Sequence, residues 1–190
     1  MNNDHVAFLA SDIWAQMLRE DLLPWLTKDG DLGDDVLEIG PGPGRTTDLL
    51  REQAARVTAL ELDEALARDL AARLAGSNVE VVHGDGTDTG LDADRFSSVT
   101  CFHVFHHIPT VEQQDRLLAE VCRVLRPGRS FLLADALDIA DIRDRHELEG
   151  EIFVPLDPAS LSDRLRGAGF ADAVVEAGSY QLFCRARKPA

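Results

Sequence analysis

The sequence predicts an α/β fold with a mainly parallel sheet and helices on both faces. Short apolar runs alternate along the chain with segments of helical periodicity. A glycine-rich segment, Gly40–Gly44, stands directly between the first apolar run and the next helix. The last two apolar runs are separated only by Gly178–Ser179, which suits an antiparallel hairpin. The 190 residues fit one domain, so we expect residues 1–190 to fold as a unit.

The first third of the chain predicts a helix and two strands. Around Ser11–Glu20 apolar residues recur at helical spacing, and we expect Pro24 to interrupt any continuation. Val36–Ile39 is a short apolar run ending in glycines, which is typical of a buried parallel strand. A helix begins near Arg45, and Arg56–Glu61 is predicted as the second strand.

The middle of the chain continues the alternation. Asp63 is expected to cap a helix that ends at Gly76. Val79–His83 is the third predicted strand, and Ser97–Val104 contains the fourth. The stretch Gly90–Phe96 leaves little room for a helix between these strands, so we expect a loop.

The final third predicts a long helix, a fifth strand and the hairpin. The helix from Val111 to Leu125 is closed by Arg126–Gly128. Residues 137–156 are acidic and less regular, and Asp157–Pro158 is a favourable helix start. The remaining strands are expected at Arg129–Ala136, Ala173–Ala177 and Tyr180–Arg187.

Composition restricts the class of partner. The formal net charge is −15, with 45% hydrophobic and 28% charged residues, as in a globular protein. Such acidity disfavours nucleic acid, because binding it requires neutralisation of phosphates. No apolar run is long enough for a transmembrane helix and the N-terminus lacks a secretory pattern, so we expect a cytoplasmic protein. The three scattered cysteines are expected to be buried reduced thiols.

The strongest motif is the glycine loop. Gly40, Gly42 and Gly44 follow a strand and precede a helix, where the backbone must turn sharply and admit a ligand. The dinucleotide fingerprint requires its last glycine at the position of Arg45. The spacing therefore disfavours a nicotinamide-dependent oxidoreductase, although it does not exclude one.

Carboxylates follow three of the predicted strands. Glu38 precedes the loop, and we expect it to pair with a cationic ligand group or to cap backbone N–H groups. Glu61 ends the second strand, where a carboxylate can accept hydrogen bonds from ribose hydroxyls. Asp85 and Gly86 follow the third strand and could read an adenine edge or form an ordinary turn.

Taken together, these patterns resemble the class I S-adenosylmethionine-dependent methyltransferases. The resemblance covers about Val36–Asp135, through the segments VLEIGPGPG, ALELD, GDG, CFHVFHHIP and LRPGRSFLLAD. It implies a Rossmann-like three-layer sandwich with a seven-stranded, mostly parallel sheet and an antiparallel C-terminal hairpin. The last strand would lie beside the fifth.

The resemblance also implies a cofactor site. The glycine loop and the preceding carboxylate would hold the methionyl part, the second strand the ribose and the third strand the adenine, with two residues after the fourth strand flanking the methionyl chain. The implied cofactor-binding residues are Glu38, Gly40, Pro41, Gly42, Gly44, Glu61, Leu62, Asp85, Gly86, Phe102 and His103.

The histidines after the fourth strand are the candidates for a catalytic base. His103 is the one that we expect to line the pocket and to act if the acceptor must lose a proton. For His106 we favour a ring hydrogen-bonded to backbone. His5 could reach in from the N-terminal segment. We expect no metal site, because adjacent histidines such as His106 and His107 rarely point at one ion and no acidic ligand follows the fourth strand.

The expected activity is methyl transfer to a small-molecule or lipid-like acceptor at oxygen, nitrogen or carbon. An N-terminal helical lid (residues 1–30, including Phe8, Trp14 and Met17) and a short acidic lid (residues 137–156) should cover the site. A module that binds S-adenosylmethionine without turnover stays open as an alternative.

Overall fold

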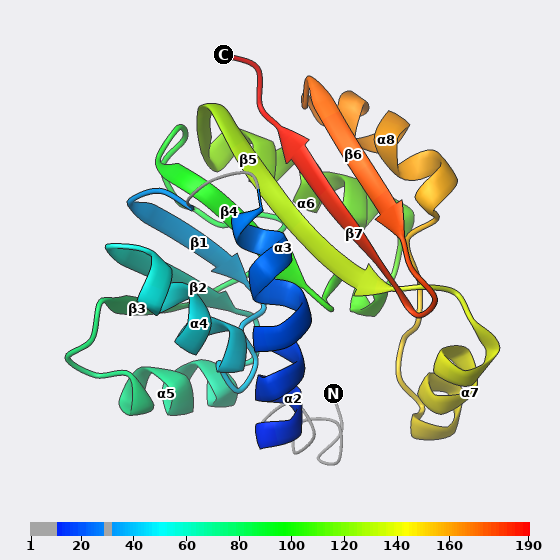
Figure 1. The fold of residues 1–190 in the computed structure, drawn as a ribbon, viewed down its shortest axis with the longest axis horizontal. Coiled ribbons are helices and arrows are strands. Elements are labelled where there is room, and N and C mark those ends of the chain that lie inside the picture. The colour runs from blue at the N-terminus through cyan, green and yellow to red at the C-terminus, as the bar shows by residue number, and fades with distance from the viewer. Residues whose placement is uncertain (1–10, 29–31) are drawn as a thin grey trace.

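The structure, a computed structural model, describes residues 11–28 and 32–190. It contains one seven-stranded sheet in the order β3-β2-β1-β4-β5-β7-β6 (Figure 1). The strands are β1 (Asp35–Ile39), β2 (Arg56–Glu61), β3 (Val79–His83), β4 (Phe96–Phe102), β5 (Leu125–Ala136), β6 (Asp172–Ala177) and β7 (Gln181–Arg187). The helices are α2 (Asp12–Met17), η1 (Leu18–Leu22), α3 (Leu23–Thr27), α4 (Arg45–Gln53), α5 (Glu64–Arg73), η2 (Phe105–His107), α6 (Val111–Val124), α7 (Ala140–Glu149) and α8 (Pro158–Gly167).

The direction of the strands agrees with the predicted fold. β1 pairs in parallel with β2 on one side and with β4 on the other, and β4 pairs in parallel with β5. The last strand, β7, lies antiparallel between β5 and β6, with Ser130 opposite Arg187. The predicted Rossmann-like sheet with its C-terminal hairpin is therefore confirmed.

Helices cover both faces of the sheet, and each face has its own core (Figure 1). On one face, α6 and α8 pack through residues such as Leu118 and Leu161 against β4 and β5. On the other, α4 and the N-terminal helical segment pack through Leu50 and Leu18 against β1 and β2. Because β1 is completely buried between these layers, its residues Val36–Ile39 are apolar except for Glu38.

The predicted N-terminal caps of α5 and α8 are confirmed. Asp63 caps α5 by accepting the Ala65 and Leu66 N–H groups at 2.9 Å, and Asp157 caps α8 with Pro158 in its first turn. Within the described chain no helix forms between β3 and β4, where a loop was expected. The three cysteines are buried and unlinked.

Two boundaries differ from the prediction. Pro24 does not stop the N-terminal helix, because α2 continues through the π-helical turn η1 and Pro24 falls in the first turn of α3. Proline lacks the N–H that would continue the hydrogen-bond pattern, and the π-helical turn immediately before it marks where that pattern changes. β5 begins at Leu125 and absorbs Arg126–Gly128, which was expected only to close the preceding helix.

The acidic segment is more regular than expected, since residues 140–149 form α7. His5 and Phe8, which we expected in the N-terminal lid, lie outside the described residues. Among the helices that the structure describes, none has the length and apolar character needed to cross a membrane.

Candidate active site

The sheet reverses its strand order between β1 and β4, and the predicted site residues gather at the carboxyl ends of these strands. In open α/β sheets ligands bind outside this edge, at the switch in strand order. The loop after β1, the end of β2 and the loop after β4 all meet here (Figure 1). The contacts at this edge therefore decide what the site can hold.

The glycine loop adopts a backbone that favours glycine. Gly40, Gly42 and Gly44 have φ values of 69°, 53° and 85°. A Cβ on Gly40 would meet Val104 Cγ2 at 2.4 Å, so the loop after β4 closely approaches the bend. A Cβ on Gly42 would meet nothing within 4 Å. The middle of the loop thus presents bare backbone to open space, which suits a closely bound ligand.

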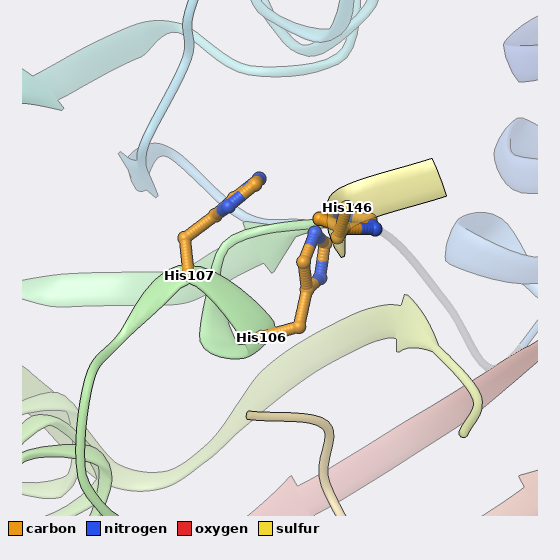
Figure 2. Close-up of side chains that lie close together, drawn as sticks. All are labelled: His106, His107 and His146. Atoms are coloured by element: carbon orange, nitrogen blue, oxygen red, sulfur yellow. The ribbon is translucent and has the colours of Figure 1, made fainter. Parts of the chain in front are cut away.

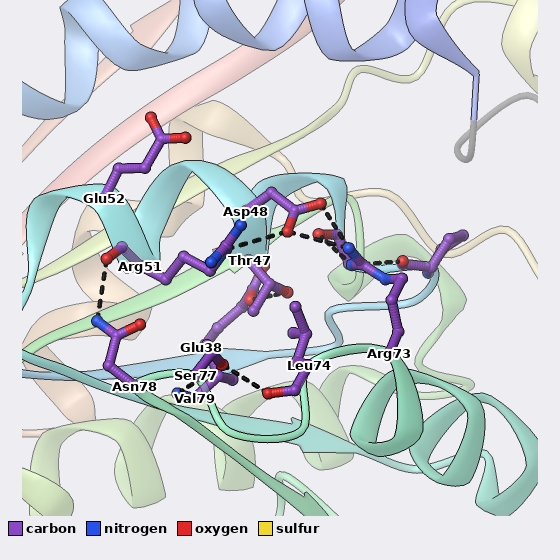
Figure 3. Close-up of polar contacts among 12 residues, drawn as sticks. Glu38, Thr47, Asp48, Arg51, Glu52, Arg73, Leu74, Ser77, Asn78 and Val79 are labelled. Carbon is purple, nitrogen blue, oxygen red and sulfur yellow. Dashed lines mark hydrogen bonds and ion pairs between the residues drawn. The ribbon is translucent and has the colours of Figure 1, made fainter.

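Arg73 from α5 holds the outer side of this loop, a contact that the sequence analysis did not anticipate. Its guanidinium donates to the carbonyl oxygens of Pro43 and Gly44 at 3.2 and 3.0 Å. It also binds the Asp48 carboxylate at 2.8 and 3.0 Å (Figure 3). The bend is thereby tied to both neighbouring helices.

Glu38 is a buried carboxylate at the end of β1. It is 1% exposed, and the hydroxyls of Thr46 and Thr47 donate to its two oxygens, the latter at 2.6 Å (Figure 3). Burial, with a smaller contribution from the nearby Glu61, raises the pKa of Glu38 to about 7 against the opposing effect of the two hydroxyls. A cation placed beside this carboxyl would favour its ionised form. The alternative of a backbone cap is not what the structure shows, since threonine hydroxyls bind this carboxylate. The predicted pairing with a cationic ligand group stays a prediction.

Glu61, at the end of β2, is also buried and binds backbone. One carboxylate oxygen accepts the Gly42 N–H and the other accepts the Asp63 N–H, both at 2.9 Å. Each carboxylate oxygen can accept a second hydrogen bond. Glu61 therefore joins the glycine loop to β2 while retaining capacity to bind a ligand hydroxyl. The adjacent Leu62 is exposed.

Asp85 and Gly86 lie just beyond β3. Asp85 accepts the N–H and hydroxyl of Thr87, both at 2.8 Å, so the turn considered in the sequence analysis does form. Gly86 lies against Ile39 and Leu117, and an added Cβ would meet each at 3.1 Å. Asp85 is exposed, and its predicted contact with adenine stays a prediction.

Phe102 is the last residue of β4 and His103 follows it, and their side chains have different surroundings. The Phe102 side chain is buried in the core with the N-terminal helical segment. His103 has a positive φ of 57°, its N–H donates to Ala134 at 2.8 Å, and its ring packs edge-on against Trp14. His103 also lines a hollow together with Trp14, Leu18, Gln181 and Phe183.

His106 has a different partner from the one expected. The prediction of a backbone acceptor is wrong, because His106 Nδ1 binds the Asp135 side chain at the end of β5. Asp135 also accepts the Phe105 N–H at 2.7 Å. Burial would raise the pKa of Asp135, but His106 and the backbone donors hold it below its usual value.

Comparison with known proteins decides the family. The model of the methyltransferase domain family matches residues 37–133, which include the glycine loop, both buried glutamates and β4. This chain belongs to the S-adenosylmethionine-dependent methyltransferases. The family uses S-adenosylmethionine as methyl donor, so the match decides against the nicotinamide-dependent alternative.

Several curated methyltransferases are similar to the chain. A Mycolicibacterium smegmatis protein named "Probable S-adenosylmethionine-dependent methyltransferase" is 33% identical over 146 residues, covering 73% of this chain and 52% of that protein. A demethylmenaquinone methyltransferase from Clavibacter sepedonicus is 32% identical over 54% of this chain and 41% of its own length. The methyltransferase thus spans about half the length of these relatives.

Solved structures of other methyltransferases share the fold. The N-methyltransferase NodS from Bradyrhizobium japonicum, in complex with S-adenosyl-L-homocysteine, has a TM-score of 0.75 at 18% identity and covers 100% of this chain and 94% of that one. The DhpI–SAH complex has a TM-score of 0.71 at 24% identity, with 98% and 94% covered. These similarities concern the fold alone.

The sequence analysis missed several residues that hold the groups of this candidate site. Thr46 and Thr47 immediately follow the loop motif, so their position could have suggested hydroxyl donors for Glu38. Arg73 and Asp135 lie far from their partners along the chain, and no local pattern marks them.

Replacing Gly40 tests the close contact at the bend. Gly40→Ala should lower the free energy of unfolding by roughly 1–3 kcal/mol, because the new methyl needs a positive φ and overlaps Val104. Gly76→Ala is the control, since Gly76 has φ 78° and open space around it. Urea unfolding should show the larger loss for Gly40→Ala, and Val104→Ala should reduce the cost of the added methyl. Equal losses at both glycines would contradict the packing argument.

The pKa of Glu38 predicts a pH-dependent stability of the ligand-free protein. The folded pKa of about 7 exceeds the ordinary 4.5, so this group's stabilising contribution is complete below pH 4.5 and is lost as the pH rises through 7. Between pH 5 and pH 8, wild type should lose roughly 2–3 kcal/mol more unfolding free energy than Glu38→Gln. Urea unfolding at both pH values measures this difference, and exposed Glu64→Gln should behave as wild type. Parallel pH profiles of wild type and Glu38→Gln would refute it.

Proposed function

We propose that this chain transfers a methyl group from S-adenosylmethionine to a small-molecule or lipid-like acceptor. The observation that carries the proposal is the pair of buried carboxylates, Glu38 and Glu61, on either side of a glycine loop that is open at Gly42. A nucleoside with a cationic side chain matches this arrangement. Glu38 offers a negative charge to an ammonium group, and Glu61 offers acceptors to ribose hydroxyls.

The residues around the loop would bind and orient the cofactor. Gly40, Pro41, Gly42 and Gly44 are proposed to border its methionyl part, and Leu62 to flank its ribose. Asp85 and Gly86 are proposed to contact adenine, and Phe102 and His103 the methionyl chain. When bound, S-adenosylmethionine supplies a methyl group on a sulfonium that is already a good leaving group. The protein's remaining task is to align the acceptor for in-line displacement and to exclude water.

The hollow at His103 is the proposed acceptor side. Trp14, Leu18 and Phe183 give it apolar and aromatic walls, while His103 and Gln181 contribute polar atoms. This mixture favours an acceptor with an aromatic or aliphatic part and a nucleophilic atom. His103 is proposed as the group that removes a proton where the acceptor carries one.

Charge favours a small acceptor over nucleic acid. The net charge of −15 opposes binding of a polyanion. A ribosomal RNA small subunit methyltransferase A from Deinococcus radiodurans is 54% identical, but over only 56 residues and 19% of its length. That short match does not extend to a whole RNA-binding protein. We further propose that residues 1–190 act as one domain, with residues 1–30 and 137–156 covering the acceptor.

Binding of S-adenosylhomocysteine tests the cofactor site. Glu61→Ala should weaken its affinity at least tenfold, because the ribose acceptors and the Gly42 contact are both lost. Glu64→Ala, three residues along the chain and exposed, should leave the affinity unchanged. Isothermal titration calorimetry measures both, with circular dichroism to confirm folding. Unchanged affinity in Glu61→Ala, or no affinity in wild type, would overturn the proposed site.

A labelled methyl donor tests turnover and acceptor class. Label should pass into low-molecular-weight or lipid fractions of a metabolite extract and not into ribosomal RNA. With the acceptor so obtained, His103→Asn should lower turnover at least 100-fold while changing S-adenosylhomocysteine affinity less than twofold, since asparagine tolerates the left-handed backbone. Cofactor binding without transfer to any fraction would instead identify a non-catalytic module.

A further inference from the structure

Three histidines from two separate elements converge beside the loop after β4. His106 and His107 belong to η2, and His146 comes from α7 (Figure 2). One ring nitrogen of each lies within 4.8 Å of those of the other two. The ring centroids are 4.1 Å apart for His106 and His107, 5.2 Å for His106 and His146, and 5.6 Å for His107 and His146.

Two of the three imidazoles are oriented as metal ligands usually are. His106 donates its Nδ1–H to the Asp135 carboxylate, and His146 donates its Nδ1–H to the Ile142 carbonyl oxygen at 2.8 Å. An ionised carboxylate and a carbonyl cannot donate, so each contact places a proton on Nδ1, which leaves the lone pair of the neutral imidazole on Nε2. Metal-binding histidines characteristically direct their second nitrogen at such an acceptor.

Asp135 is itself held in place. Its carboxylate accepts the Phe105 and Ala136 N–H groups, both at 2.7 Å. The ring of His106 is therefore fixed through a buried network that begins on β5. Such support from a second layer of contacts distinguishes this cluster from histidines that meet by chance on a surface.

The position of His146 in α7 is a second, independent observation. It is the one buried residue of α7, whereas the apolar Leu148 on the same helix is 89% exposed. An amphipathic helix normally attaches to its domain through apolar residues. Here the buried contact is an imidazole, which stacks on Phe153 and faces the two histidines of η2.

We propose that His106, His107 and His146 bind a divalent first-row transition metal ion of the Zn²⁺, Co²⁺ or Ni²⁺ class. Three imidazoles without a thiolate or carboxylate in the set suit these ions better than Mg²⁺ or Ca²⁺, which prefer oxygen ligands. Zinc–nitrogen bonds of about 2.0–2.1 Å in a tetrahedron place two nitrogens about 3.4 Å apart. Small side-chain rotations would bring the observed cluster to that spacing.

This inference differs from the sequence expectation for a specific reason. That expectation held that the adjacent His106 and His107 would not point at one ion, whereas the fold brings a ring nitrogen of each within 4.8 Å of the other. The third ligand proposed here is His146, which the fold supplies from α7. The bound ion would tie α7 to the turn that follows β4, and three protein ligands would leave a coordination position for water or an acceptor atom.

Metal titration of the untagged, chelator-treated protein tests the proposal. Calorimetry should show one Zn²⁺ per chain, and Co²⁺ should give the visible absorption of a bound, low-coordinate ion. Mg²⁺ should not compete at equal concentration. His146→Phe, which retains an aromatic ring against Phe153, and His107→Gln should each weaken Zn²⁺ binding at least tenfold. His83→Gln, at an exposed histidine on β3, is the matched control and should bind as wild type.

The outcomes separate this proposal from the proposed methyl transfer. Zinc affinity lost in both cluster variants and retained in His83→Gln, with S-adenosylhomocysteine affinity intact throughout, would support it. No zinc binding by wild type, equal binding by all variants, or equal preference for Mg²⁺ would overturn it. Two substitutions at differently buried positions, each checked by circular dichroism, keep the result interpretable if one variant fails to fold.

Discussion

Two carboxylates buried at the ends of adjacent strands constrain the rest of this structure. The groups that bind Glu38 are the hydroxyls of Thr46 and Thr47, and those that bind Glu61 are backbone N–H groups of Gly42 and Asp63. Neutral donors offset only part of the cost of burying charge, and the two carboxylates raise each other's energy. A cation brought by a ligand would relieve both costs. In the proposed cofactor site, a cationic ligand would therefore supply the positive charge that these buried carboxylates lack in the protein alone.

The glycine loop connects the two buried carboxylates to the remainder of the fold. Glu61 holds the bend from β2, Arg73 holds it from α5, and Val104 packs against Gly40 from the loop after β4. A shift of any one of these elements would move the backbone that faces the ligand. The positive φ values are tolerated because glycine occupies each position, so the bend combines an unusual shape with little strain.

The sequence predicted those features that depend on neighbouring residues. Local patterns predicted the apolar runs of β1 to β4, the caps at Asp63 and Asp157, and the glycine loop. Periodicity and turn chemistry act over a few residues, so a short segment is enough to show them. The continuation of the helix past Pro24 was not, since packing of the N-terminal segment on the sheet overrides a local breaker. The His106–Asp135 pair joins residues 29 positions apart, and no periodic pattern encodes such a contact.

The same distinction explains why the sequence identifies the cofactor but not the methyl acceptor. The family match ends at residue 133, whereas Gln181 and Phe183, which line the proposed acceptor side, lie beyond it. Long-range contacts also join a later segment to the turn after β4. Gln114 donates to the carbonyl oxygens of Phe105 and Val154, and the Val154 N–H donates to that of His106. Because these contacts join segments outside the shared motif to the turn after β4, changes in the later segments can alter this turn, which follows His103 of the proposed acceptor side. The glycine loop and its two carboxylates need not change with them.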